Sequence, residues 1–141
     1  MKNHCLLLVA ILPSILSFAQ QTAFYTDPEA KFKEAKEYFQ KEQYSLAYPL
    51  FKELKQDVRE TNRANIPVTV QEINYYHTVC ALKQNEGRAE VEAQQYIEVE
   101  KNNARVQMMN FHLAEYYFRQ EKFSDAVLLY ESANIANLSN R

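Results

Sequence analysis

Glycine is almost absent from this chain of 141 residues, which contains a single one, and tryptophan is absent altogether. Strand-rich folds and phosphate-binding loops need glycine for tight turns and for close approach of the backbone. The composition therefore favours helices and excludes a glycine-rich phosphate loop. The chain also has no large excess of either charge, because its 16 Lys and Arg nearly balance its 18 Asp and Glu, which gives a net charge of -2. Without a basic surface, we expect no nucleic-acid partner.

Long hydrophobic runs are missing as well, apart from one short run near the N-terminus. Lys2 is followed by an apolar stretch over 5–16 and by small residues up to Ala19, the pattern of a secretion signal. A run of about twelve residues is shorter than the roughly twenty that span a bilayer. We therefore predict a signal peptide over 1–19 and no integral membrane segment in the mature chain, 20–141, with an uncleaved anchor as the alternative.

An internal duplication organises the rest of the chain, with an offset of 79 residues. The matched positions are aromatic or small in both copies: Phe32/Phe111, Ala35/Ala114, Tyr38/Tyr117, Phe39/Phe118, Ala47/Ala126 and Phe51/Tyr130. Each copy has two apolar stripes at helical spacing around a polar stretch, which predicts two helices joined by a tight turn. Ser45 and Ser124 are the predicted N-caps of the second helices, and Pro49 is predicted to lie in a first turn.

A looser copy lies between these two. Its pattern predicts a helix over about 69–83, a turn at 85–87 with Gly87 at the helix end, and a second helix that begins near Ala89. Aligning Ala89 with the alanines of the outer copies fixes the register only to within one residue and places an insertion over 59–68. The three predicted units cover about 28–58, 69–101 and 105–136.

Four positions of the outer copies carry a resemblance to a known family. They are Ala35, Tyr38, Ala47 and Phe51 in the first copy, and Ala114, Tyr117, Ala126 and Tyr130 in the last. This pattern resembles the tetratricopeptide repeat. Gln21 to Glu29 and Tyr75 to Leu82 also resemble the N-terminal part of large exported tetratricopeptide proteins of bacterial envelopes. The resemblance implies an all-α, right-handed superhelix of about three helix-turn-helix units. It also implies a scaffold role in the periplasm or at the outer membrane.

In the family, the first helix of each repeat lines a concave groove that binds a peptide. Carried onto this sequence, the groove residues are Phe32, Lys36, Phe39, Gln40, Asn74, Thr78, Phe111, Glu115, Phe118 and Arg119. Phe39 and Phe118 would offer apolar surface. Lys36 and Arg119 would bind a carbonyl or carboxylate of a protein or peptide partner. The alternative for each residue is a stacking contact between repeats.

Residues that suggest chemistry are few. His77 and Cys80 are three residues apart, so they would supply half of a zinc site, but no second His or Cys lies at ligand spacing. An exported enzyme or metal protein centred on this pair is the alternative to a scaffold, and a purely structural spacer is another. Four glutamates, at 90, 92, 98 and 100, are interpreted as a solvated charged face. We expect neither a metal nor a cofactor.

The last predicted helix, over 124–136, has an apolar face with Val127, Leu128, Leu129 and Tyr130. Repeat arrays need a polar outer face on their terminal helix, because exposed apolar surface promotes association. We therefore expect the chain either to be the front part of a longer array or to associate with another copy through this helix.

Overall fold

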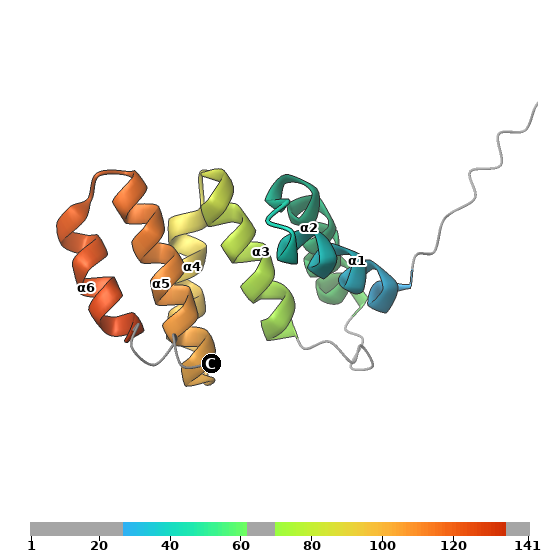
Figure 1. Cartoon of the computed structure of the whole chain (residues 1–141). Helices are drawn as coiled ribbons and strands as arrows, with labels where there is room; N and C mark the ends of the chain where they lie inside the picture. Colours follow the sequence, from blue (N-terminus) through green and yellow to red (C-terminus); the bar gives the residue numbers. More distant parts are fainter. Residues whose placement is uncertain (1–26, 62–69, 135–141) are drawn as a thin grey trace, which may run out of the picture.

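The computed structural model describes residues 27–61 and 70–134, and these contain six helices and no strand. The helices are α1 (Pro28–Gln40), α2 (Tyr44–Thr61), α3 (Val70–Gln84), α4 (Ala89–Val99), α5 (Asn103–Arg119) and α6 (Phe123–Ala133). They follow one another along a row, from α1 and α2 at one end to α6 at the other (Figure 1). The all-α prediction is therefore confirmed, and none of the described helices is both long and apolar enough to cross a bilayer. The predicted signal peptide and most of the predicted insertion lie outside the described residues.

One type of turn joins the two helices of every pair. The residue that turns the chain is left-handed in all three, with φ of 57° at Glu42, 63° at Asn85 and 60° at Glu121. The next N–H then donates to a carbonyl five residues back, and the three bonds of 2.9, 3.0 and 3.0 Å join Gln43 to Tyr38, Glu86 to Ala81 and Lys122 to Tyr117. These bonds are those of a Schellman motif, which satisfies carbonyls at a helix end.

This turn fixes the register of the middle pair. Because Glu86 bonds to Ala81 as Gln43 bonds to Tyr38, Ala81 is the middle counterpart of the tyrosine in the outer copies. The alignment through Ala89 was therefore wrong by one residue in the first helix. The prediction that Gly87 ends this helix was wrong as well, since Asn85 takes the left-handed conformation that asparagine tolerates.

The second helices of the two outer pairs begin earlier than predicted, whereas α4 begins at Ala89, as predicted. α2 begins at Tyr44 and α6 at Phe123, so Ser45 and Ser124 lie inside the first turn, and α6 has no side-chain cap bond at Lys122. The carbonyl of Lys122 already accepts from Ala126 N at 3.0 Å, so the tight turn leads directly into the next helix. Pro49 consequently lies within α2, beyond its first turn. At the other end, α6 stops at Ala133, before the predicted 136, because Asn134 is left-handed with φ of 50°.

Buried side chains form two clusters along the row, and α3 contributes to both. The first cluster contains Phe32, Ala35, Ala47, Phe51, Leu54, Ile73 and Cys80. The second contains Val79, Ala81, Leu82, Ala89, Ala93, Tyr96, Met109, Leu113, Tyr117 and Ala126. The fully buried Ala35, Ala47 and Ala114 lie where neighbouring helices pack closely, which explains why the duplicated pattern keeps small residues there.

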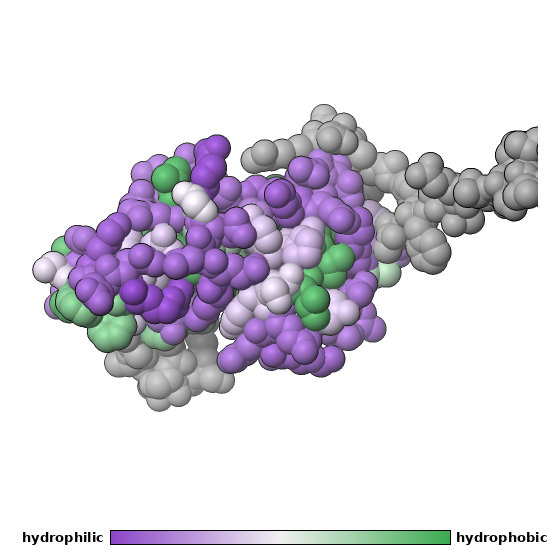
Figure 2. Space-filling model, turned by 90° about the horizontal axis from the view of Figure 1, so that it is seen from above, coloured by the Kyte–Doolittle hydropathy of each residue, from purple (hydrophilic) through white to green (hydrophobic). Residues whose placement is uncertain are grey.

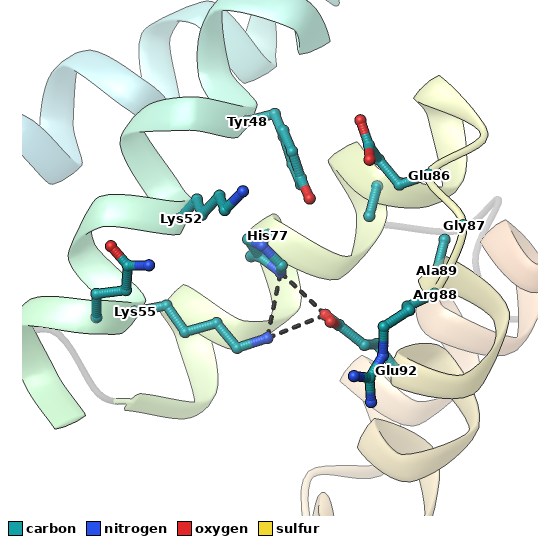
Figure 3. A pocket seen from close by; sticks show the side chains of 11 residues that line it. Tyr48, Lys52, Lys55, His77, Glu86, Gly87, Arg88, Ala89 and Glu92 are labelled. Carbon is teal, nitrogen blue, oxygen red and sulfur yellow. Dashed lines mark hydrogen bonds and ion pairs between the residues drawn. The ribbon is translucent and has the colours of Figure 1, made fainter.

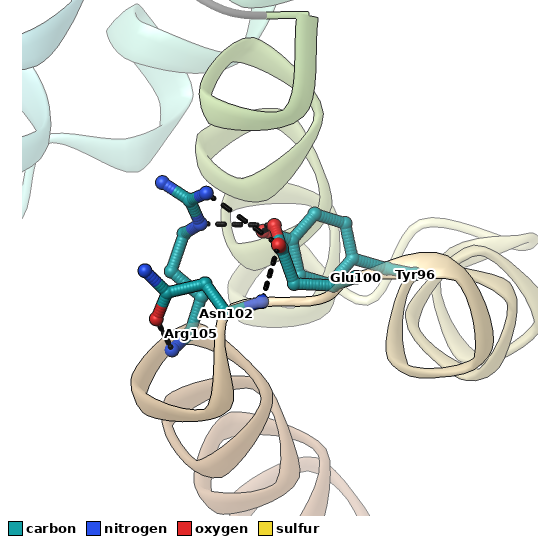
Figure 4. Close-up of polar contacts among 4 residues, drawn as sticks. All are labelled: Tyr96, Glu100, Asn102 and Arg105. Atoms are coloured by element: carbon teal, nitrogen blue, oxygen red, sulfur yellow. Dashed lines mark hydrogen bonds and ion pairs between the residues drawn. The ribbon is translucent and has the colours of Figure 1, made fainter.

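A buried carboxylate connects α4 to α5 (Figure 4). Glu100 directly follows α4, and its side chain is 4% exposed. It accepts from Tyr96 Oη at 2.6 Å, from the backbone N–H of Asn102 at 2.8 Å and from Arg105 Nε at 2.9 Å. Asn102 in turn caps α5, since its Oδ1 accepts from the backbone N–H of Arg105 at 3.2 Å. The cluster fixes the direction in which the chain enters α5.

Candidate functional site

Two hollows open between α2 and α4, with α3 as their floor. The first, with a volume of about 340 Å³, is drawn in Figure 3. The second, of about 350 Å³, borders the first at Lys55 and Glu92. The first hollow is lined by charged and aromatic side chains, chiefly Tyr48, Lys52, Lys55, His77, Arg88 and Glu92. Its lining residues come from α2, α3, α4 and the turn that leads into α4.

Three side chains meet at the border between the hollows, one from each helix (Figure 3). Lys55 Nζ lies 3.0 Å from Glu92 Oε2 and 3.3 Å from His77 Nδ1. His77 Nδ1 is also 3.2 Å from the same carboxylate oxygen, and the imidazole ring stacks on Tyr48 with centroids 5.0 Å apart. This polar triad links α2, α3 and α4, and the ring of Tyr48 covers His77.

The charges of the triad are settled by burial and by Lys55. Burial, and then the positive charge of Lys55, lower the pKa of His77 to about 4. Burial alone would raise the pKa of Glu92, but the hydrogen bond and charge of Lys55 outweigh it and lower that pKa. At neutral pH the site is therefore a Lys55–Glu92 ion pair with a neutral imidazole beside it. A general base needs a pKa near the working pH, so His77 is poorly matched to acid–base chemistry.

His77 and Cys80 do not act on one point. His77 lines the hollow between α2 and α4, whereas Cys80 belongs to the first core cluster and is fully buried. Burial raises the pKa of the Cys80 thiol to about 12, so a thiolate is not available for nucleophilic attack or metal binding. Within residues 27–61 and 70–134, no group of three His, Cys, Asp or Glu side chains is placed to hold a metal ion.

The predicted groove residues of α1 mostly contact neighbouring helices. Phe32 is 7% exposed and belongs to the first core cluster, so the expectation that it faces a ligand was wrong. Phe39 is half-buried, with ring centroids 5.5 Å from Tyr44 and 4.8 Å from Tyr76. Lys36 lies 3.6 Å from Glu72 of α3, and Gln40 is exposed.

The predicted residues of α5 divide in the same way. Glu115 accepts from Lys83 of α3 at 2.7 Å, and Arg119 donates to the backbone carbonyl of Leu82 at 2.8 Å. Phe111 is half-buried, whereas Phe118 is 57% exposed. The charged residues therefore connect adjacent first helices, and Phe118 is a large apolar side chain that remains available to a partner.

The predicted residues of the middle unit face a different side of the molecule. Asn74 and Thr78 line the second hollow, between α2 and α4, and Thr78 is 2% exposed. A shift of one residue turns a side chain by about 100° around a helix, so the register error moved the prediction to the wrong side. With the register set by the turn, the counterparts of Lys36 and Gln40 are Val79 and Lys83.

The sequence interpretation missed the structural role of three glutamates. Glu92 belongs to the triad, Glu100 is buried at the start of α5, and Glu90 accepts from Tyr117 Oη at 2.8 Å. The description of a solvated face fits Glu98, which is exposed. The sequence does contain a signal for two of them. Glu92 directly precedes the buried Ala93, and Glu100 lies four residues after the buried Tyr96.

Exposed apolar side chains gather on the last helix pair. We define the terminal surface as Phe118, Phe123, Val127 and Leu128, which are 57, 53, 53 and 63% exposed. Hydrophobic side chains are visible at the α6 end of the molecule in Figure 2. Single exposed apolar residues are ordinary on soluble proteins, but neighbouring ones, such as Phe118 and Phe123 with ring centroids 5.4 Å apart, are typical of an interaction site.

Comparisons of the chain with protein-family models, with curated proteins and with solved structures found no match.

Proposed function

We propose that this chain is a non-catalytic scaffold of the bacterial cell envelope that binds a protein or peptide partner through a tetratricopeptide-like, right-handed array of three helix pairs. The observation that carries the proposal is the terminal surface, where four large apolar side chains are more than half exposed. Exposed apolar surface of this kind gains free energy when a partner removes it from water.

The geometry of the polar residues favours a scaffold over an enzyme. Within the triad, Lys55 and His77 both contact the carboxylate of Glu92, and Cys80 is fully buried in the core. Catalysis needs a nucleophile or base that reaches a substrate, together with groups that stabilise developing charge. The described hollows offer an internally paired cluster instead, which serves to hold three helices together.

The groove along the first helices is the less favourable of two binding surfaces. A peptide that bonded to Lys36, Glu115 or Arg119 would have to replace the bonds that these residues make to neighbouring helices. Binding at the terminal surface needs no such exchange. A spacer without affinity, the remaining alternative, would leave the terminal surface without a partner.

Capture of a partner from an envelope extract tests the proposal. The wild-type chain is compared with a Phe118→Ser/Phe123→Ser variant and with a Val91→Ser/Val99→Ser control, whose residues are exposed elsewhere, on α4. We expect the same protein to copurify with the wild type and the control and to be lost with the first variant. A His77→Ala/Cys80→Ser variant that folds should keep the partner. Failure to recover any specific partner with the wild type would refute the scaffold.

A further inference from the structure

The aromatic rings of the last helix pair repeat an arrangement found in the first. In the first pair, Phe32 meets Phe51 edge-on with centroids 5.9 Å apart, and Phe39 meets Tyr44 at 5.5 Å. In the last pair, the residues 79 positions later form the same contacts: Phe111 meets Tyr130 at 5.8 Å, and Phe118 meets Phe123 at 5.4 Å. All four contacts are edge-to-face, with interplanar angles of 71° and 80° in the first pair and 61° and 67° in the last.

In the first pair, a ring from the next helix fills the space among these aromatic residues. Tyr76 of α3 lies 5.9 Å from Phe32, 4.8 Å from Phe39 and 5.3 Å from Phe51, and it stacks on Phe51 at an interplanar angle of 13°. Phe51 is fully buried as a result. α3 also bonds to the backbone here, since Gln84 Nε2 donates to the carbonyl of Tyr44 at 3.1 Å.

In the last pair, two of the matching rings are open, whereas Phe111 and Tyr130 are half-buried. Phe118 and Phe123 are more than half exposed, and Val127, the counterpart of Tyr48, is 53% exposed. We call the four rings of the last pair, Phe111, Phe118, Phe123 and Tyr130, the aromatic socket. It has the geometry of a helix-binding site that the first pair already uses.

We propose that the aromatic socket binds an amphipathic helix of a partner protein, which inserts an aromatic side chain among the rings as Tyr76 of α3 does in the first pair. This inference rests on the proposed scaffold function and names the class of partner. The same edge-to-face contacts recur in both pairs, and equal ring geometry offers equal contacts to an incoming ring. Helix-in-groove recognition uses such anchors at one face of the partner helix.

The first pair also defines the chemistry of the helix beyond its aromatic anchor. One turn after Tyr76 stands the small, buried Cys80, which lets the helix approach closely. Two further residues meet the turn of the first pair, Lys83 with its Nζ 5.9 Å from the centroid of the Tyr44 ring and Gln84 through its bond to the Tyr44 carbonyl. The partner helix should therefore carry an aromatic residue, a small apolar residue four positions later, and a cation or amide in the following turn.

A fluorescent peptide tests the proposal on the full chain, which contains no tryptophan of its own. The probe is a synthetic peptide with the sequence of α3, Val70–Gln84, carrying Tyr76→Trp and Cys80→Ala. A hydrocarbon staple between positions 74 and 78, away from position 76, keeps it helical. The matched control peptide carries Tyr76→Ala and Gln71→Trp, so that its fluorophore lies outside the anchor position.

Binding to the socket should shift the emission of the probe to shorter wavelength, and the shift should saturate with protein concentration. Phe118→Ser should weaken binding about tenfold or more, since it removes a ring contact, whereas Val99→Ser should leave it unchanged. Equal binding of both peptides, no binding of the probe, or full binding to Phe118→Ser protein would overturn the proposal. The last result would indicate that the probe displaces α3 instead.

Two outcomes separate this inference from the scaffold function. Capture of an envelope partner that survives Phe118→Ser/Phe123→Ser would keep the scaffold and overturn the helix-binding socket. Binding of the probe without any captured partner would support the socket and refute the scaffold. Analytical sedimentation of the chain alone is a third test. A dimer that Phe118→Ser abolishes would show that a second copy of the chain occupies the socket, and it would overturn the proposal of a partner helix.

Discussion

Tyr96 donates a 2.6 Å hydrogen bond to Glu100, four residues later, at the point where α4 ends. The phenol thereby covers a carboxylate that is almost completely removed from water. Burial alone would raise the pKa of Glu100, but the hydrogen bonds from Tyr96, Asn102 and Arg105 outweigh it and bring that pKa down to about 2. This buried charge therefore helps to hold the start of α5 at the end of α4, beside the core cluster that the two helices share.

Replacing Glu100 by Gln should lower the free energy of unfolding by about 2 kcal/mol, because it removes charge-assisted hydrogen bonds and leaves Arg105 without its partner. Glu98→Gln is the matched control, since Glu98 is exposed two residues earlier, near the end of α4, and it should change stability by less than about 0.5 kcal/mol. Urea denaturation measures both. Equal effects of the two substitutions would contradict the structural role of Glu100.

The carboxylate of Glu100 should also make the free energy of unfolding decrease at acidic pH. Its pKa is lower in the folded chain than in the unfolded chain, so its contribution is complete above the unfolded value near 4.5 and is lost as the pH falls toward 2. Between pH 4.5 and 2.5, wild-type stability should fall more steeply than that of Glu100→Gln. Thermal melts across this range test the slope, and parallel curves would exclude the pKa shift.

His77 should make the folded chain sensitive to milder acid. Its pKa is lowered from 6.5 to about 4, so the unfolded state binds a proton first as the pH falls, and stability decreases between these values. From pH 7 to pH 5, this effect is on the order of 2 kcal/mol. His77→Gln, which cannot take up a proton, should remove most of the loss, whatever its stability at pH 7. A variant with the wild-type pH dependence would show that other groups are responsible.

The two ends of the duplication should respond unequally to equivalent substitutions. Phe39→Ser removes a ring that packs on Tyr76 and should destabilise the chain by about 2–4 kcal/mol. Phe118→Ser, at the matched position, removes a ring that is 57% exposed and should cost less than about 1 kcal/mol. Chemical denaturation of the two variants measures the difference. Similar losses would mean that the last pair already carries a covering element over Phe118.

The paired helices and their approximate bounds could be predicted because the signals are local. The spacing of Phe32, Ala35 and Phe39 marks an amphipathic helix, and its recurrence at Phe111, Ala114 and Phe118 marks a second copy. The middle pair lacks the key tyrosine, since Ala81 occupies its place. Its register became clear only from the hydrogen bond between Glu86 and Ala81.

The site could not be predicted because its contacts join residues far apart in the chain. Lys55 and Glu92 come from different helices, and the place of Glu92 beside the apolar Ala93 does not indicate which residue it contacts. Phe39 and Phe118 occupy equivalent positions of the two copies, yet Phe39 is half-buried and Phe118 is exposed. What decides between them is whether a following helix covers the pair, and that is a property of the assembled array.

A crystal structure of the chain bound to the stapled α3 peptide would show whether the last helix pair binds a helix as the first pair does. We expect the indole of the peptide among Phe111, Phe118 and Tyr130, with ring centroids about 4.5–7 Å apart, and the peptide alongside α6 as α3 runs alongside α2. A peptide found in the hollows between α2 and α4, or in place of α3 itself, would contradict this expectation.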